Sequence, residues 1–354
     1  MIGARRIRVL IIDDSLVVRE TLVSLIEDHP QLEIMGTAID PFEAAERIRH
    51  EVPDVITLDI EMPRMDGITF LRRLMQQKPL PVIVCSSRVG AGSPALIEAL
   101  DAGAVDVIPK PAVGTRQFLE ESAIRIQDKI IAAANARLNL KTPQATIAKR
   151  TGPSVQVRAS AGSSSVIAIG ASTGGTEALK YVLSSLPADT PPVIIVQHMP
   201  EHFTSAFASH LNEICSVNVR EAAHGDRLTR GHVLIAPGDK HLELHRTGQD
   251  YRVKVVDGPL VSRHRPSVDV LFRSTAKFAG ANAIGVILTG MGQDGADGLK
   301  TLRDAGARTI GQNEASCVVY GMPRVAKSLG AVEVEADLRD IPHLLFEILG
   351  RHAA

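Results

Sequence analysis

The stretch from Ser165 to Leu179, SVIAIGASTGGTEAL, constrains the fold of this chain more than any other. Val166 to Ile169 is an apolar run typical of a buried strand, and a glycine-rich turn follows it directly. A helical pattern then begins at Thr176. In a parallel sheet, such a unit places its turn at the carboxyl edge, where unpaired helix amides face a bound ligand. We therefore expect Ser172 to stand in a site.

Three interpretations of this turn compete. Ser172 could be a nucleophile beside amides that stabilise an oxyanion, although the G-x-S-x-G spacing of many hydrolases is absent. The glycines could instead admit a phosphate, but neither a P-loop lysine nor the G-x-G-x-x-G spacing is present. They could also serve only to pack the helix closely on the strand. A serine nucleophile needs a base and an orienting acid, so the first interpretation requires that the rest of the chain supply both.

Bulk properties exclude several classes of protein. The chain has 354 residues, 45% of them hydrophobic, which predicts two or three domains with cores of their own. A net charge of -1 gives no general attraction to nucleic acid or to an anionic membrane. The three cysteines share no spacing typical of disulfide frameworks or zinc sites. Because no apolar run is long enough to span a membrane or to act as a signal peptide, we expect a soluble cytoplasmic protein without membrane insertion.

The first part of the chain, from Ile7 to about Leu138, alternates apolar strands with helical stretches, which predicts a parallel sheet with helices on both faces. The expected strands are RVLIIDDS, EIMGTAI, VITLDI, PVIVCSS and VDVIPKP. Polar side chains follow the ends of four of them, namely Asp13, Asp14, Asp59, Ser86, Ser87 and Lys110. The carboxyl ends of parallel strands meet at one edge of a sheet, so these groups are expected to converge.

The three aspartates at this edge predict a metal site. Their carboxylates would repel one another unless a hard divalent cation neutralised them, and oxygen ligands suit Mg²⁺. A central acid with a metal ion, a hydroxyl and an ammonium group around it can accept a phosphoryl group, and Asp59 holds that position. The alternative is that the acids only cap helices and face solvent.

The same features resemble the receiver domain of response regulators, through the pair Asp13-Asp14, the central Asp59, the segment MPRMDG, Ser86 and Lys110-Pro111. The resemblance implies a flavodoxin-like fold with a parallel five-stranded sheet and Asp59 as the phosphorylated residue. It also implies Asp14, Asp59 and the backbone carbonyl of Glu61 as magnesium ligands, and supporting roles for Asp13, Ser86 and Lys110.

A change of composition after about Leu138 marks a domain boundary. From Lys129 to Thr176 the chain has no acidic residue, and the part from Leu140 to Ser165 is rich in Lys, Arg, Thr, Ser, Gly and Pro. This composition is typical of a flexible, positively charged linker. An amphipathic helix is expected before it, from Arg116 to about Leu138. We predict a receiver domain over 1–138, a linker over 139–164 and a second domain over 165–354.

The second domain again alternates strands with helices. The expected strands are VIAIGAS, PPVIIVQHM, VNVREA, GHVLIAPG, AIGVILTG and RTIGQ, with HLELHRTGQDYRVKVV as a hairpin. The pattern predicts a three-layer α/β/α domain with a mostly parallel sheet and one antiparallel excursion.

Two of these strands supply partners for Ser172. The run VIIVQ ends in His198, and AIGVILTG leads into a glycine turn that contains Met291 and Asp294. Serine, histidine and aspartate at one rim are equipped for attack on a carbonyl, proton exchange and orientation of the imidazole. Amides after Ser172 and around Met291 could complete an oxyanion hole. The alternatives are that His198 only packs at a strand end and that Asp294 only serves a turn or helix cap.

Six motifs together resemble the catalytic domain of the chemotaxis protein-glutamate methylesterases of the CheB type. They are IGASTGG, VQHM, HGDRL with GHVLIAPG, HRPSVD, LTGMGQDGADGL and NEASCVVYGMP. That family hydrolyses glutamyl methyl esters on chemoreceptor helices, releasing methanol, and often deamidates receptor glutamines. The resemblance implies Ser172 as the nucleophile, His198 as the base, Asp294 as the orienting acid, and the backbone amides of Thr173 and Met291 as oxyanion donors.

The resemblance also implies partners and control. Methyl-accepting chemotaxis receptors would be the substrates, and a histidine kinase would phosphorylate Asp59 and so relieve inhibition by the receiver domain. Mg²⁺ is expected only in the receiver, with no cofactor in the esterase site and no nucleic acid partner. His264 and Arg265 of HRPSVD are expected to contact a receptor helix. Two other classes stay open: a phosphorylation-dependent binding module with an inactive esterase site, and nucleotide binding at IGASTGG.

Overall fold

The computed structural model describes residues 5–86, 94–111, 116–138 and 165–351. The chain forms two compact units, of which the first comprises Met1–Leu138 with Met199–Phe207 and the second comprises the remaining residues. The predicted linker over 139–164 and the strand-end residue Ser87 lie outside the described residues.

The first unit is built on a five-stranded sheet in the order β2-β1-β3-β4-β5, and every neighbouring pair is parallel. Its strands are β1 Ile7–Ile12, β2 Leu32–Ala38, β3 Val55–Asp59, β4 Val82–Ser86 and β5 Asp106–Pro109. This is the strand order of flavodoxin-like folds, in which ligands bind at the carboxyl ends of β1 and β3. The predicted fold of this unit and all five predicted strands are confirmed.

Helices connect these parallel strands, as the alternating pattern predicted. They are α1 Leu16–Ile26, α2 Pro41–His50, α3 Gly67–Gln77, α4 Pro94–Asp101 and α5 Arg116–Ala134. Two of them begin at an aspartate whose side chain accepts helix amides: Asp40 caps α2 and Asp66 caps α3. The last helix ends at Ala134, several residues before the predicted end at Leu138.

The second unit is built on a seven-stranded parallel sheet in the order β14-β13-β12-β6-β7-β9-β8. Its strands are β6 Val166–Ala171, β7 Val193–Gln197, β8 Asn218–Glu221, β9 His232–Ile235, β12 Ala283–Ile287, β13 Arg308–Gln312 and β14 Val334–Ala336. The antiparallel hairpin β10 His241–Thr247 and β11 Asp250–Val256 forms a separate sheet. The predicted architecture is confirmed, except that β14 was not predicted.

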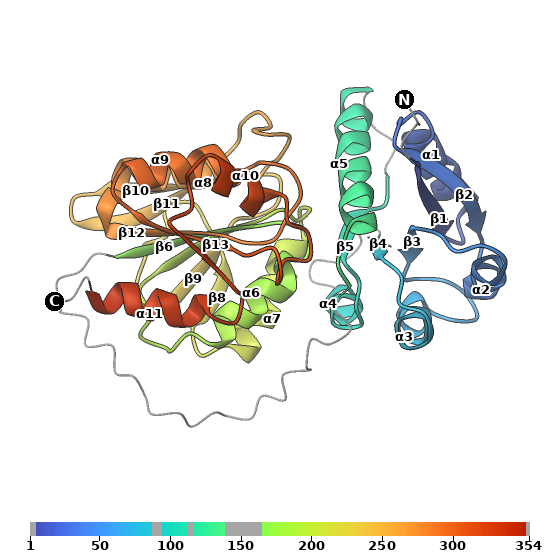
Figure 1. Ribbon diagram of the computed structural model, residues 1–354, viewed down its shortest axis with the longest axis horizontal. Helices are drawn as coiled ribbons and strands as arrows, with labels where there is room; N and C mark the ends of the chain where they lie inside the picture. The colour runs from blue at the N-terminus through green and yellow to red at the C-terminus, as the bar shows by residue number, and fades with distance from the viewer. Residues whose placement is uncertain (1–4, 87–93, 112–115, 139–164, 352–354) are drawn as a thin grey trace. The chain divides into compact units, whose positions relative to one another are not determined.

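The second unit has three layers, with α8, α9, α10 and the hairpin on one side of the sheet and α6 and α11 on the other (Figure 1). Its helices are α6 Gly175–Ser184, α8 Val268–Phe278, α9 Ala296–Asp304, α10 Met322–Ser328 and α11 Ile341–Arg351, with a short 3-10 helix at Gly280–Asn282. The helix α7 Phe203–Ile214 begins in the segment Met199–Phe207, which is counted with the first unit, and continues into the second. None of the helices in the described residues is long and apolar enough to cross a membrane.

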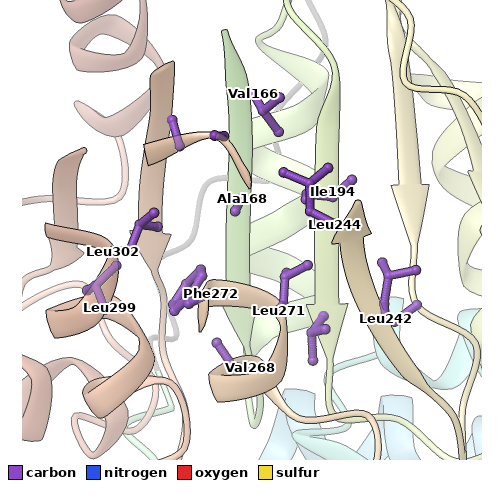
Figure 2. Packing of buried hydrophobic residues seen from close by; sticks show 14 of the residues in the cluster. Val166, Ala168, Ile194, Leu242, Leu244, Val268, Leu271, Phe272, Leu299 and Leu302 are labelled. Carbon is purple, nitrogen blue, oxygen red and sulfur yellow. The ribbon is translucent and has the colours of Figure 1, made fainter. Parts of the chain in front are cut away.

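A hydrophobic core lies between the sheet and the layer formed by α8, α9 and the hairpin (Figure 2). Alternate residues of β6 point into it, because successive strand side chains face opposite sides of a sheet. Its labelled members are Val166, Ala168, Ile194, Leu242, Leu244, Val268, Leu271, Phe272, Leu299 and Leu302. This packing holds the start of α8 beside the end of β6, which fixes one side of the candidate site.

The centre of the sheet is a topological switch point. From β6 the chain first builds one side of the sheet through β7, and it later returns to add β12 on the other side of β6. Crevices for ligands form where the strand order reverses in this way. The turn after β6, which contains Ser172 and a left-handed Gly174 (φ +76°), therefore lies where a ligand site is expected.

Candidate functional site

Ser172 follows β6 directly and is held between two neighbouring strands. Its N–H donates to the carbonyl oxygen of Thr289 at 3.0 Å, and its side chain is buried. Gly290 approaches it so closely that a Cβ on this glycine would lie 2.6 Å from the Cβ of Ser172. The loop after β12 can reach the serine only because this residue has no side chain.

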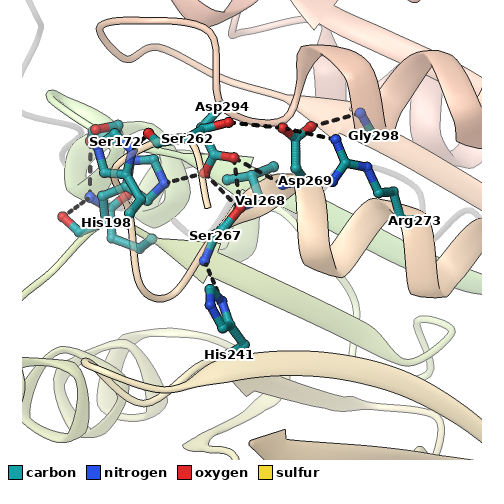
Figure 3. Close-up of polar contacts among 12 residues, drawn as sticks. Ser172, His198, His241, Ser262, Ser267, Val268, Asp269, Arg273, Asp294 and Gly298 are labelled. Atoms are coloured by element: carbon teal, nitrogen blue, oxygen red, sulfur yellow. Dashed lines mark hydrogen bonds and ion pairs between the residues drawn. The ribbon is translucent and has the colours of Figure 1, made fainter. Parts of the chain in front are cut away.

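His198 follows β7 and is brought to Ser172 by the register of the sheet. Ala171 pairs with Gln197 across the two strands, and the N–H of His198 donates to the carbonyl oxygen of Ala171 at 3.1 Å. Figure 3 shows Ser172 and His198 next to each other, with Asp294 close to the imidazole. The residue is 5% exposed, and its Nε2 lies 2.8 Å from Oδ2 of Asp294.

Asp294 is the most firmly held member of the group. Its Oδ1 accepts hydrogen bonds from the hydroxyl of Ser267 at 2.7 Å and the N–H of Asp269 at 3.1 Å, and its Oδ2 accepts one from the N–H of Val268 at 2.7 Å. These donors form the start of α8, where the helix dipole favours a negative charge. Burial raises the pKa of Asp294, but the hydrogen bond from His198 and the surrounding donors outweigh it, so this pKa lies below its ordinary value.

The hydrogen-bond pattern assigns the tautomer of His198. Because Nε2 faces a carboxylate, it carries the proton, which leaves Nδ1 as the basic nitrogen. Nδ1 is buried and accepts no hydrogen bond within the described part of the chain. The ring therefore presents a fixed lone pair that can receive a proton.

His264 lies flat against His198. The two ring centroids are 3.8 Å apart and the ring planes differ by 8°. His198, His264 and Asp294 together offer ligand atoms within 4.8 Å of one another, which is close enough for a metal site. Imidazole nitrogens bind metals in the plane of their ring, however, and two parallel stacked rings cannot both direct a lone pair at one ion. The stacked arrangement therefore does not suit one shared metal ion.

Sequence reasoning missed the residues that support Asp294. Ser267 is fully buried, and its N–H donates at 3.2 Å to Nδ1 of His241, itself buried on β10. Asp269 accepts the N–H of Gly298 at 2.7 Å and so joins α8 to α9. Burial and the nearby charge of Asp294 raise the pKa of Asp269. Ser267 lies within the motif HRPSVD, but no local pattern indicates that it faces Asp294 in the turn between β12 and α9.

The two predicted oxyanion residues lie on the loops that meet at Ser172. Thr173 is buried directly after the serine, and its carbonyl oxygen accepts the hydroxyl of Thr289 at 3.0 Å. Met291 follows Gly290, the residue that contacts Ser172. The role of either amide as an oxyanion donor stays a prediction.

In the first unit, Asp13, Asp59 and Lys110 come together at the carboxyl edge of the sheet. Lys110 Nζ lies 2.7 Å from Oδ2 of Asp59 and 3.1 Å from Oδ2 of Asp13, and both aspartates are buried. The lysine is positioned by its N–H, which donates to the carbonyl oxygen of Ser86 at 2.7 Å. Burial and the charge of Asp13 raise the pKa of Asp59, although the hydrogen bond from Lys110 opposes this.

The carboxylates of this edge fit a magnesium ion. Asp13, Asp14 and Asp59 offer oxygen atoms within 4.8 Å of one another, and Asp14 is exposed to solvent. Three hard oxygen donors of like charge are the ligand set that Mg²⁺ prefers. The N–H of Glu61 donates to Oδ1 of Asp59 at 3.2 Å, which places this residue at the site, while the role of its carbonyl as a ligand stays a prediction.

Known families match both units. Residues 167–345 match the CheB methylesterase family, and residues 9–121 match the response regulator receiver domain. A protein-glutamate methylesterase/protein-glutamine glutaminase of Geobacter metallireducens is 53% identical over 98% of this chain and 100% of its own length. A protein of the same name from Rhodospirillum rubrum is 56% identical over 93% of this chain and 94% of its own.

Among solved structures, the CheB methylesterase catalytic domain of Thermotoga maritima matches with a TM-score of 0.52 and 34% sequence identity. The match covers 52% of this chain and 99% of that domain. Since the relatives extend along nearly the whole chain and the family matches fall on both units in order, this chain belongs to the CheB family of protein-glutamate methylesterases, with an N-terminal receiver domain.

Proposed function

We propose that this protein hydrolyses glutamate methyl esters on methyl-accepting chemotaxis receptors in the cytoplasm, with Ser172 as the nucleophile, His198 as the base and Asp294 as the orienting acid. The observation that carries the proposal is the state of the imidazole. Its Nε2 is held by Asp294 at 2.8 Å, and its Nδ1 is buried without a hydrogen bond among the described residues. The names of the relatives support the same reaction.

In the first half of the reaction, the hydroxyl oxygen of Ser172 attacks the ester carbonyl carbon while Nδ1 of His198 takes the hydroxyl proton. Asp294 stabilises the imidazolium that forms. The amides of Thr173 and Met291 donate hydrogen bonds to the tetrahedral oxyanion. When this intermediate collapses, His198 returns the proton to the methoxy oxygen, so methanol leaves and an acyl-serine ester stays behind.

In the second half, a water molecule attacks the acyl carbon and gives its proton to His198. Collapse of the second tetrahedral intermediate breaks the bond to the Ser172 oxygen, which takes the proton back from the imidazole. The products are a receptor glutamate and the original enzyme. A glutamine side chain would follow the same course with ammonia as the leaving group, as the glutaminase part of the relatives' names indicates.

The first unit would control this reaction. We propose that Asp59 accepts a phosphoryl group from a histidine kinase and that this relieves inhibition by the receiver domain. Asp14, Asp59 and the carbonyl of Glu61 would hold Mg²⁺, which when bound balances charge on the phosphoryl oxygens. Lys110 supplies a second positive charge 2.7 Å from the accepting carboxylate.

The test is methanol release from a methyl-esterified receptor cytoplasmic domain, measured with the full-length protein before and after addition of Mg²⁺ and a small phosphoryl donor. We expect release by the wild type, an increase on phosphorylation, and loss of about 10⁴-fold or more in Ser172→Ala. Ser185→Ala is the matched control, because this exposed serine lies at the other end of α6.

Each outcome has a distinct meaning. Release that depends on Ser172 but not on phosphorylation would support the site and reject the switch. No release in either state would reject the enzymatic proposal and favour the phosphorylation-dependent binding module. Full activity in Ser172→Ala would mean that the nucleophile lies elsewhere.

A further inference from the structure

The carbonyl oxygen of Ser172 accepts two hydrogen bonds. One comes from the N–H of Gly175 at 2.7 Å, within the turn itself. The other comes from the side-chain amide of Gln197, whose Nε2 lies 2.9 Å away. Gln197 is the last residue of β7, so a neighbouring strand contributes to the conformation of the turn.

The two hydrogen bonds to the Ser172 carbonyl determine the direction of the Thr173 N–H. The Ser172 carbonyl and the Thr173 N–H belong to one planar trans peptide unit, in which C=O and N–H point in opposite directions. Fixing the oxygen with two donors therefore fixes the N–H of Thr173 on the other side of the plane. Oxyanion stabilisation depends on such donors being aimed before the charge develops.

The second candidate oxyanion amide has a matching arrangement. The carbonyl oxygen of Gly290 accepts the N–H of Gly321 at 3.0 Å and the N–H of Met322 at 2.8 Å. It shares a peptide plane with the N–H of Met291, which is thereby fixed as well. Both loops around Ser172 thus carry a peptide unit whose carbonyl is held by two donors, and in one of them a donor is a side chain.

An apolar residue could fill the space that Gln197 occupies, so packing does not explain why an amide stands there. It is 1% exposed at the end of the apolar run VIIVQ, and its Oε1 is buried with no hydrogen bond partner in the described residues. Burying an amide oxygen in this way opposes folding. Its Nε2 donates to the carbonyl oxygen of Ser172 at 2.9 Å and, at the longer distance of 3.5 Å, to the carbonyl oxygen of His198.

We propose that Gln197 is a positioning residue of the oxyanion hole: its side-chain amide holds the Ser172–Thr173 peptide so that the Thr173 N–H faces the developing oxyanion. The proposal rests on the proposed function, because it assumes that Ser172 forms a tetrahedral intermediate. Gln197 acts through the backbone and does not touch the substrate.

The test is the variant Gln197→Met in the full-length protein, which keeps the length and volume of the side chain and removes the donor. Loss of an oxyanion donor lowers kcat about 100- to 1,000-fold. A donor that is present but wrongly oriented should have a smaller effect, so we expect kcat to decrease about 10- to 100-fold. KM for the methyl-esterified receptor domain should change less than about 2-fold, since the ground-state ester carries no oxyanion charge.

The pH dependence of kcat distinguishes an effect on the oxyanion hole from an effect on the neighbouring base, His198. Gln197 precedes His198, so a substitution that disturbs the imidazole would shift the pH dependence of kcat. We expect the pH profile of Gln197→Met to keep its midpoint. The matched control is Thr190→Val, which removes a buried side-chain hydrogen bond to Pro187 before the amino end of the same strand and should leave kcat unchanged.

The outcomes distinguish this inference from the proposed function. A wild type without Ser172-dependent ester hydrolysis would overturn both. An active wild type with unchanged kcat in Gln197→Met would overturn this inference alone, as would a lowered kcat together with a shifted pH midpoint. If Gln197→Met is not stably folded by circular dichroism, Gln197→Leu provides the same comparison, because leucine also lacks a donor to the Ser172 carbonyl. Full kcat in that variant would reject the inference.

Discussion

Asp59 in the first unit and Asp294 in the second are the same residue type at the carboxyl edge of a parallel sheet, and each is 1% exposed. Their pKa values nevertheless shift in opposite directions. Burial raises the pKa of Asp59, and the hydrogen bond from Lys110 does not compensate. For Asp294 burial acts in the same sense, but the hydrogen bonds around it lower the pKa.

The difference lies in the neighbours. Asp294 accepts four hydrogen bonds, from Ser267, Val268, Asp269 and His198. Asp59 accepts one from Lys110 and one from the amide of Glu61, and it lies beside a second buried carboxylate. A carboxylate whose acceptor positions are filled can orient another group without reacting. One with unfilled positions and a repelling neighbour is suited to bind a cation or to attack a phosphorus atom.

The largest effect is expected for Asp294→Asn. The new NH₂ group would face the amide donors of α8, and the neutral side chain would no longer form an ion pair with His198. We therefore expect kcat to fall about 10³- to 10⁴-fold. The unfolding free energy should fall by about 3 kcal/mol, because buried donors lose their acceptor. Methanol release and urea unfolding measure the two effects. Asp297→Asn is the control, since this exposed aspartate lies in the first turn of α9. Equal losses in both variants would contradict the special role of Asp294.

A smaller effect is expected from pH. The folded pKa of Asp294 lies below its ordinary value of about 3.8, so the stability it contributes is complete above about pH 4 and is lost as pH falls through the folded pKa. At about pH 5 the carboxylate of Asp294 is ionised in both the folded and the unfolded state, so its own contribution to the difference in unfolding free energy between wild type and Asp294→Asn is complete there. Below about pH 4 it should shrink by up to about 1.4 kcal/mol per pH unit. A difference that grows on acidification would reverse the assigned direction.

The smallest effect is expected for Asp59→Asn in buffer without divalent cations. The substitution removes one of two adjacent buried carboxylates, and Lys110 keeps its ion pair with Asp13 at 3.1 Å. The unfolding free energy of the first unit should therefore change by about 1 kcal/mol or less, in either direction. Asp66→Ala is the reference, because losing this helix cap should cost about 1 kcal/mol. A loss as large as that of Asp294→Asn would remove the contrast between the two aspartates.

The fold was predictable because its strands are long apolar runs bounded by turn residues. The exceptions have physical reasons. β14 has only three residues, VEA, at the edge of its sheet, and so short a segment shows no period. The predicted end of α5 at about Leu138 was too late, because the helix ends at Ala134. Without a cap signal, an amphipathic pattern does not show the residue at which a helix ends.

The candidate site was predictable only in part. Ser172, His198 and Asp294 each follow an apolar run, and a parallel sheet brings such positions to one edge, so the local sequence contained enough to group them. The contact of Ser267 with Asp294 depends on the packing of α8 against the sheet, which no local pattern encodes. Gln197 did leave a signal, as a single amide at the end of the otherwise apolar run VIIVQ.

The order in which β12 joins the sheet has a consequence for synthesis. Asp294 follows His198 by 96 residues and lies in the turn after β12, which pairs with β6 on the side opposite β7. While the ribosome is still adding that part of the chain, β6 and β7 can pair and bring Ser172 to His198, but the imidazole has no carboxylate beside it. Under the proposed function, a nascent chain would therefore hold Ser172 beside an imidazole that lacks its carboxylate. Ester hydrolysis would begin only after the segment that contains Asp294 has been made and inserted.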